Sequence, residues 1–142
     1  GLLGGALMKV VPEAVAFRGR LEQMNAPVYP YDIAFLCAGT KGFAACEGNT
    51  EAFRADVDGN IFLARHLLKL GTFVVFVSTD AVEVALNGAY ARNRMLVELA
   101  IGGLPNVAIF RPGKFDEHNV KTCAQTLARV GRDRVEGLTR WP

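Results

Sequence analysis

The apolar residues of this chain form short unbroken runs, which are separated by longer stretches where they recur at helical spacing. The clearest run is Phe73–Val77, in which five apolar residues, mostly β-branched or aromatic, follow one another without a polar position. Such a run predicts a strand buried on both faces, as in a parallel sheet covered by helices. Shorter runs predict further strands at 14–17, 33–37 and 107–110.

Helical spacing of the apolar residues predicts four helices. The first begins almost at residue 1 and ends before Pro12, and the second follows the turn-prone residues 48–50 and ends near Gly71. The third spans about 89–101, and the fourth is amphipathic and begins near residue 120. The predicted apolar stripe of the second helix consists of Phe53, Val57, Ile61, Ala64, Leu67 and Leu68.

Helices that alternate with short apolar strands predict an α/β fold, in which a doubly wound parallel sheet has right-handed crossovers and helices on both faces. We therefore expect three layers in a single domain that covers residues 1–142. Residues 135–142, which contain the one tryptophan, are expected to form a short tail.

Composition narrows the class of protein. The net charge is +2 with acids and bases interspersed, which does not indicate nucleic-acid binding. No apolar run reaches the length of a membrane span and no signal peptide is apparent, so we expect a cytoplasmic protein without membrane contact. The cysteines Cys37, Cys46 and Cys123 form no CxxC pair, which predicts free thiols and no metal site.

Polar side chains follow the run Phe73–Val77 directly, as Ser78, Thr79 and Asp80. Open α/β sheets bind their ligands outside the carboxyl ends of the strands. Tyr90 lies at the start of the next predicted helix, and Arg94 shares its helix face because it is four residues further on. Thr79 and Tyr90 could therefore converge on one reacting carbon, or Tyr90 is simply a residue at the start of a helix.

Glycines and arginines near the start of the chain suggest a dinucleotide site. Gly1, Gly4 and Gly5 head the first predicted helix, where glycines let the backbone approach a pyrophosphate; the alternative is a tight turn that packs closely on the sheet. Arg18 and Arg20 follow the first predicted strand, where arginine accepts the 2′-phosphate of NADP. The alternative is that both arginines are ordinary solvated side chains.

Several stretches together resemble the extended short-chain dehydrogenase/reductase superfamily, and most closely its dTDP-4-dehydrorhamnose reductase-like, sugar-nucleotide-binding branch. The resemblance covers nearly the whole chain, and the order and spacing of its motifs carry it. The matching stretches are Gly1-Leu-Leu-Gly4-Gly5, Asp32-Ile-Ala-Phe-Leu-Cys-Ala-Gly39, Ala45-Cys-Glu-Gly-Asn49, Asp56-Val-Asp-Gly59, Val77-Ser-Thr-Asp80, Tyr90-Ala-Arg-Asn-Arg94 and Arg111-Pro112-Gly113.

This resemblance implies a minimal Rossmann-like domain that binds NADP or NAD, with NADP preferred, and a nucleotide sugar or other small molecule as substrate. It implies a catalytic set of Thr79, Tyr90 and Arg94, in which Tyr90 exchanges a proton with the substrate oxygen. It further implies a homodimer that uses Met95 and Leu99. The implied cofactor contacts are Gly1, Gly4, Arg18, Arg20, Ala38, Gly39, Arg111 and Pro112, of which Gly1 and Gly4 belong to a partial glycine-rich turn at 1–5.

Departures from the family pattern raise a second hypothesis. Arg94 stands where the family has its catalytic lysine, Asp56 stands where it has an asparagine, and the segment from Thr79 to Tyr90 is shorter. The family's first strand would lie before Gly1, and its substrate domain is missing. The alternative function is therefore a catalytically inactive binding or regulatory module that acts through a protein partner.

Overall fold

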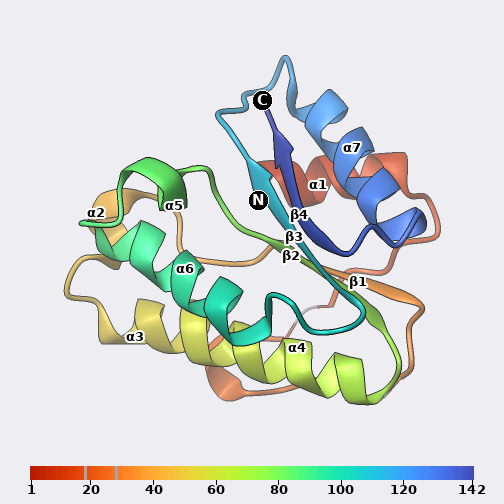
Figure 1. The fold of residues 1–142 in the computed structure, drawn as a ribbon, viewed down its shortest axis with the longest axis horizontal. Helices are drawn as coiled ribbons and strands as arrows, with labels where there is room; N and C mark the ends of the chain where they lie inside the picture. Colours follow the sequence, from red (N-terminus) through yellow and green to blue (C-terminus); the bar gives the residue numbers. More distant parts are fainter. Residues whose placement is uncertain (18, 28) are drawn as a thin grey trace.

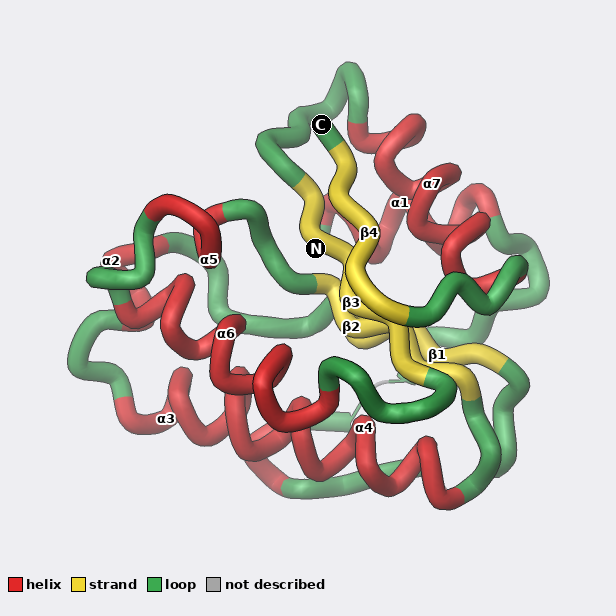
Figure 2. The backbone as a smooth tube through the Cα atoms, in the orientation of Figure 1, coloured by secondary structure: helices red, strands yellow, loops and turns green. Residues whose placement is uncertain are grey.

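A computed structural model describes residues 1–17, 19–27 and 29–142 of the chain. Its centre is a four-stranded parallel sheet whose strands lie side by side in chain order (Figures 1 and 2). The strands are β1 (Ile33–Leu36), β2 (Phe73–Val77), β3 (Val107–Pro112) and β4 (Gly137–Trp141). Every residue of β2 is buried, as its unbroken apolar run predicted.

Helices cover both faces of the sheet, which confirms the predicted three-layered, Rossmann-like α/β fold in one domain. Helices α1 (Leu2–Val10) and α7 (Val120–Arg132) pack on one face, against the side chains of Phe73, Val75 and Val77. Helices α4 (Asn60–Lys69) and α6 (Ala89–Ile101) pack on the other, against Val74 and Phe76. The alternation of β2 side chains between two cores explains why no polar residue is tolerated along it.

The connections between successive strands do not all have the same hand. Each connection advances to the next strand in the same direction, but α4 and α6 lie on one face and α7 on the other. Two crossovers that advance in one direction over opposite faces of a parallel sheet have opposite hands. The prediction of uniformly right-handed crossovers is therefore wrong, because α7 instead covers the apolar face that it shares with α1.

Two predicted elements at the ends of the chain are corrected. Residues 14–17 form no strand, because no neighbouring strand pairs with them and Val15 and Phe17 stay 72% and 49% exposed. The predicted tail at 135–142 contains β4, which pairs with β3 from Ala108↔Gly137 to Pro112↔Trp141. This strand lies at the sheet edge and is partly exposed, so it lacks the apolar run that marks β2.

The predicted long helix is interrupted by a segment with wider hydrogen-bonded turns. It begins as α3 (Thr50–Phe53), continues as the π-helical segment η2 (Arg54–Gly59), and ends as α4. The wider turns rotate the helix, so that Ala52 is buried while Phe53, predicted to face the core, is 41% exposed. Gly59 packs against the backbone of the short helix η1 (Leu21–Gln23), where a Cβ would stand 2.6 Å from the carbonyl oxygen of Leu21.

Two further short helices, α2 (Phe43–Cys46) and α5 (Ala81–Val84), follow the carboxyl ends of β1 and β2. Within the described parts of the chain, no helix is both long and apolar enough to cross a membrane.

Candidate functional site

The carboxyl ends of β1 and β2 are joined by the side chain of Arg94, which reaches them from α6. Its Nη1 donates to the carbonyl oxygens of Ala38 at 3.5 Å and of Val77 at 3.4 Å. Gly39 has no side chain at the point where the guanidinium lies, since an added Cβ would stand 2.9 Å from Cζ. The structure thus brings together three predicted site residues, Arg94, Ala38 and Gly39.

Arg94 is a buried cation, only 7% exposed. Its guanidinium carbon lies 5.6 Å from the centre of the Phe76 ring and 5.8 Å from that of the Tyr90 ring. Among the residues that the structure describes, no carboxylate forms an ion pair with it. Aromatic faces and carbonyl oxygens therefore provide its electrostatic environment, and its positive charge is not neutralised.

Tyr90 stands beside Arg94 at the start of α6 and is partly exposed. Its ring meets the edge of Phe43 from α2, with the two centres 5.2 Å apart. Arg94 contacts the face of this ring, and the Tyr90 hydroxyl makes no hydrogen bond to any described residue. The hydroxyl is therefore free to meet a ligand.

The hydroxyl of Thr79 is occupied at the carboxyl end of β2. Its Oγ1 accepts a hydrogen bond from the backbone N–H of Ala81 at 3.2 Å and lies 3.4 Å from Oδ1 of Asp80. Thr79, rather than Asp80, thus satisfies the start of α5 with its side chain. The residue is buried, so its hydroxyl is poorly accessible to a ligand.

A buried carboxylate holds the loop after β1. Asp56 of η2 accepts hydrogen bonds from the backbone N–H of Thr40 at 2.9 Å and from its hydroxyl at 3.3 Å. The Cys46 thiol lies 4.0 Å from its other oxygen. Asp56 therefore fixes the loop that carries Gly39, a structural role that its place in the sequence did not reveal.

The amino end of α1 lies beside the same loop. Gly1 is the N-cap, and none of the described side chains forms a cap hydrogen bond there. Lys41 approaches this helix end, since a Cβ on Gly1 would stand 3.4 Å from its Nζ. Gly4 makes only ordinary contact with Cys37, at 3.8 Å, so close packing does not by itself require a glycine there.

Of the two arginines predicted to hold a 2′-phosphate, Arg20 lies within the described residues. Arg20 is exposed, lies 3.8 Å from Glu22, and lines a hollow of about 400 Å³ together with Thr40 and Arg54. It therefore reaches the neighbourhood of the loop after β1. Arg18 lies outside the described residues.

The remaining predicted cofactor contacts, Arg111 and Pro112, end β3. Arg111 donates from Nε at 3.0 Å and Nη2 at 2.5 Å to the two oxygens of Glu98, and from Nη1 at 2.9 Å to Glu83. These partners, Glu98 above all, raise the pKa of the Arg111 guanidinium. The Pro112 carbonyl accepts from the backbone of Asp80 at 3.1 Å. Arg111 is therefore engaged within the protein.

An ionic network extends from this arginine to four other elements. Ser78 donates to Glu98 of α6, and Arg140 of β4 donates to Glu83 of α5 at 2.6 Å. Hydrogen bonds from Arg140 and then Arg111 lower the pKa of Glu83. The network ties the ends of β2, β3 and β4 to the two helices beside them.

Sequence reasoning missed Lys41 and Glu98. Lys41 follows β1 by only a few residues, and a cation in the loop after a strand was a usable signal. Glu98 is an acid in the apolar part of α6, four residues after Arg94 and on its helix face. Within the described ranges no three His, Cys, Asp or Glu side chains gather as metal ligands would.

Several solved structures share this fold. A hypothetical dTDP-4-dehydrorhamnose reductase from Sulfolobus tokodaii superposes with a TM-score of 0.79 and 14% identity, over 99% of this chain and 72% of that one. A dTDP-4-dehydrorhamnose reductase from Clostridium acetobutylicum gives 0.77 and 16%, over 99% and 70%. RMD from Pseudomonas aeruginosa, solved with NADPH, gives 0.61 and 19%, over 80% and 53%.

These structures confirm, at the level of the fold, the resemblance that the motifs indicated. By sequence, no protein-family model and no curated protein matches the chain.

Proposed function

We propose that this chain is the dinucleotide-binding part of an NAD(P)-dependent protein that resembles sugar-nucleotide reductases and epimerases, with NADP preferred over NAD. The observation that carries the proposal is the meeting of the amino end of α1, Lys41 and the Gly39 loop at the carboxyl end of β1. A helix amino end beside a glycine turn and a lysine favours a pyrophosphate. The neighbour RMD, which was solved with NADPH, supports this choice of ligand.

Different residues of the chain would hold different parts of such a cofactor. The first-turn N–H groups of α1 and the Lys41 amine would hold the pyrophosphate. Arg20, exposed beside Thr40, would take the 2′-phosphate that distinguishes NADP, because a guanidinium forms paired hydrogen bonds with phosphate. Gly39 and Ala38 would border the cofactor from the loop after β1.

If the protein is active, a bound nicotinamide would supply or accept the hydride at a sugar carbon. Tyr90 would then give its hydroxyl proton to the substrate oxygen during reduction, or take one during oxidation. Arg94 lies against the Tyr90 ring, and its unneutralised charge would favour the tyrosinate that remains after proton transfer. Thr79 would donate to the substrate oxygen only by giving up its contact with Asp80, while its bond from the Ala81 N–H could remain.

A second candidate function is a catalytically inactive module that retains the fold and acts through a partner. Three observations favour it. The guanidinium of Arg94 is buried beneath the Gly39 loop, the Thr79 hydroxyl satisfies a helix start, and Arg111 is engaged by two carboxylates. Arginine also cannot replace lysine's compact ammonium without change, because its planar fork needs more space.

The test is a fluorescence titration of the protein with NADPH and NADH in parallel. We expect saturable binding of both, with NADPH tighter. Lys41→Ala should weaken both cofactors several-fold, while Lys9→Ala should change neither, because Lys9 lies at the other end of α1. Arg20→Ala should reduce the preference for NADPH.

The two functions are separated by Tyr90→Phe. Loss of turnover with cofactor binding intact would identify an enzyme. Cofactor binding with no turnover in the native protein, over a panel of nucleotide sugars, would favour the inactive module. Absence of binding for both cofactors would refute the main proposal.

A further inference from the structure

Two arginines from different elements line the hollow of about 400 Å³ beside the loop after β1. Arg20 is the N-cap of η1, and Arg54 is the first residue of the π-helical segment η2. Thr40 of the loop lines the same hollow. The sequence pattern pointed to Arg20 at this place but not to Arg54, which comes much later in the chain. Arg54 is therefore a second cation that the fold brings there.

The π-helical segment places Arg54 on the side of its helix that faces η1. Gly59 of this segment packs against η1, where an added Cβ would stand 2.6 Å from the carbonyl oxygen of Leu21. Hydrogen bonds in a π-helix join residues five apart, so Arg54 lies about one turn before Gly59 and on the same side. In a regular α-helix two such residues would point about 140° apart. Arg54 therefore faces the start of η1, where Arg20 lies.

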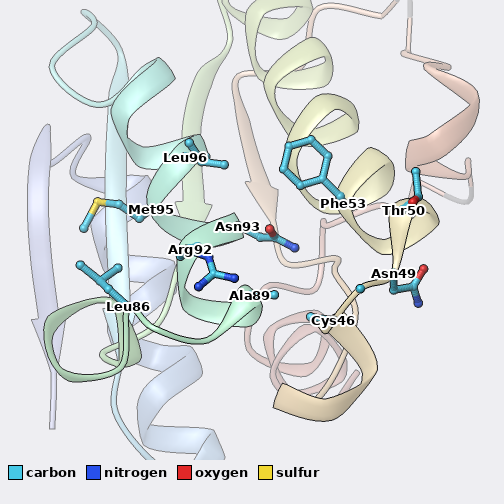
Figure 3. A pocket seen from close by; sticks show the side chains of 11 residues that line it. Cys46, Asn49, Thr50, Phe53, Leu86, Ala89, Arg92, Asn93, Met95 and Leu96 are labelled. Carbon is cyan, nitrogen blue, oxygen red and sulfur yellow. The ribbon is translucent and has the colours of Figure 1, made fainter.

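The preceding side chain, Phe53, does not line this hollow. Figure 3 shows its ring extending from α3 toward α6, into a separate pocket of about 740 Å³. Asn49 borders both spaces, but its amide is engaged by the backbone. Its Oδ1 accepts from the N–H of Ala52 and its Nδ2 donates to the carbonyl of Ala45, both at 3.0 Å. Anion recognition in the smaller hollow is thus left to the two arginines.

Two carboxylates also line the hollow, and they make the second arginine necessary. Glu22 lies 3.8 Å from Arg20, and Glu51 comes one helical turn before Arg54 without forming one of the ion pairs found among the described residues. With Arg20 alone, one guanidinium would face two carboxylates, and this lining would repel a phosphate. With Arg54 present, a phosphate can draw both guanidiniums, because paired N–H···O bonds to phosphate are stronger than a long surface ion pair.

The hollow is open to solvent, which suits a phosphate because a charged group is costly to bury. Both arginines are exposed, so their guanidiniums can turn toward an arriving ligand. Asp56 fixes the wall of the hollow by accepting from the N–H of Thr40 at 2.9 Å. Lys41, at the proposed pyrophosphate position, is the next residue after Thr40. A dinucleotide bound there would have its adenosine ribose within reach of the hollow.

We infer that Arg54 is a specificity-determining residue, which holds the 2′-phosphate of NADP together with Arg20. NAD carries a hydroxyl in place of this phosphate, so Arg54 contributes to the binding of NADPH and not to that of NADH. The inference rests on the proposed cofactor function and deepens it, since it assigns the choice between the two cofactors to a pair of residues from η1 and η2.

The test uses pairs of ligands that differ in the 2′-phosphate. Calorimetric titration compares NADPH with NADH, and adenosine 2′,5′-bisphosphate with adenosine 5′-monophosphate. Arg54→Met should reduce the preference for the phosphorylated member of each pair about tenfold, as the loss of a charge-assisted contact predicts. The affinity for NADH should stay unchanged.

Two further variants separate charge, geometry and general effects. Arg54→Lys should keep part of the preference, because lysine retains the charge but not the planar fork. Arg65→Met is the matched control, since Arg65 is an exposed arginine of α4 that does not line the hollow. It should change neither cofactor's affinity.

Glu51→Gln gives a prediction of opposite sign. It removes a repelling charge from the hollow without touching either arginine, so the preference for NADPH should rise several-fold. Loss of folding cannot mimic a gain of affinity, so this variant keeps the inference testable even if Arg54→Met misfolds.

Three outcomes would overturn the inference. They are an unchanged preference in Arg54→Met, an equal loss of NADPH and NADH affinity in that variant, and no gain in Glu51→Gln. Each would leave the cofactor proposal intact, because Lys41→Ala should still weaken both cofactors. A native protein that binds neither NADPH nor NADH would instead refute the cofactor proposal, and this inference with it.

Discussion

Arg94 occupies the space that any side chain at residue 39 would need, so the guanidinium and Gly39 are matched in size. We predict that Gly39→Ala lowers the free energy of unfolding by about 1–3 kcal/mol, the usual cost of overfilling a packed site. Urea denaturation measures this. The control is Gly5→Ala, where a Cβ meets nothing within 4 Å and alanine should stabilise α1.

A second substitution, at Arg94, tests the same contact between Gly39 and Arg94. In Gly39→Ala, the further change Arg94→Met removes the planar group that the new Cβ displaces. The double variant should therefore regain part of the lost stability. Equal stability of Gly39→Ala and the native protein would contradict the close approach of the two residues.

The buried end of the ionic network should contribute more to the free energy of unfolding than its exposed end. Glu98→Gln removes the charge from the carboxylate that Arg111 and Ser78 share, and we expect a loss of about 3 kcal/mol in unfolding free energy. Glu83→Gln is the matched control at the exposed end of the network, and its effect should be small because solvent screens it. Similar losses of unfolding free energy in Glu98→Gln and Glu83→Gln would contradict this difference between the buried and the exposed end.

The thiols of Cys37, which is partly buried, and Cys123, which is fully buried, predict a decline of stability at alkaline pH. Burial raises the pKa of Cys123 to about 11 and that of Cys37 to about 12. The unfolded chain releases these protons near pH 8.5, whereas the folded protein keeps them, so the free energy of unfolding falls as the pH rises above about 8.5.

Urea denaturation at about pH 7.5 and 9.5 measures this decline, with the double variant Cys37→Ala, Cys123→Ala as the reference that lacks both thiols. The native protein should lose more stability than the reference over this interval. Alkylation provides an independent readout, since both thiols should react slowly in the folded protein and quickly in urea.

The outer face of α6 predicts self-association. Leu99 is 73% exposed on this helix, and Met95 lies one turn before it. We expect a homodimer at micromolar concentration by light scattering, because an exposed apolar helix face favours burial against a second copy. Leu99→Lys should give a monomer, while Val84→Lys, at a similarly exposed apolar position on α5, should not. A monomeric native protein would refute the expectation.

The sequence predicted those parts of the fold that depend on uniform burial. The run Phe73–Val77 has no polar position because two cores meet on β2, and this signal is local. β4 was missed because an edge strand needs neither a continuous nor an alternating apolar pattern. Residues 14–17 were wrongly predicted because strand propensity does not supply a partner strand.

The candidate site was predictable as a set of positions but not as a set of contacts. The spacing of Tyr90 and Arg94 placed them on one helix face, and the structure brings them together. Nothing local showed that the guanidinium of Arg94 lies under Gly39, 55 positions before it in the chain. The rotation of Phe53 by the π-helical segment likewise depends on hydrogen bonding that composition does not record.

The order of the strands in the sheet has a consequence for assembly. Since β1, β2, β3 and β4 are neighbours both in the chain and in the sheet, none of these four described strands has to insert between two that have already paired. The sheet can therefore grow by addition at one edge as the chain leaves the ribosome, each new strand docking on the last. β4, the fourth of these strands, is held mainly by β3 and by the bond from Arg140 to Glu83, so its release would leave the three earlier strands paired.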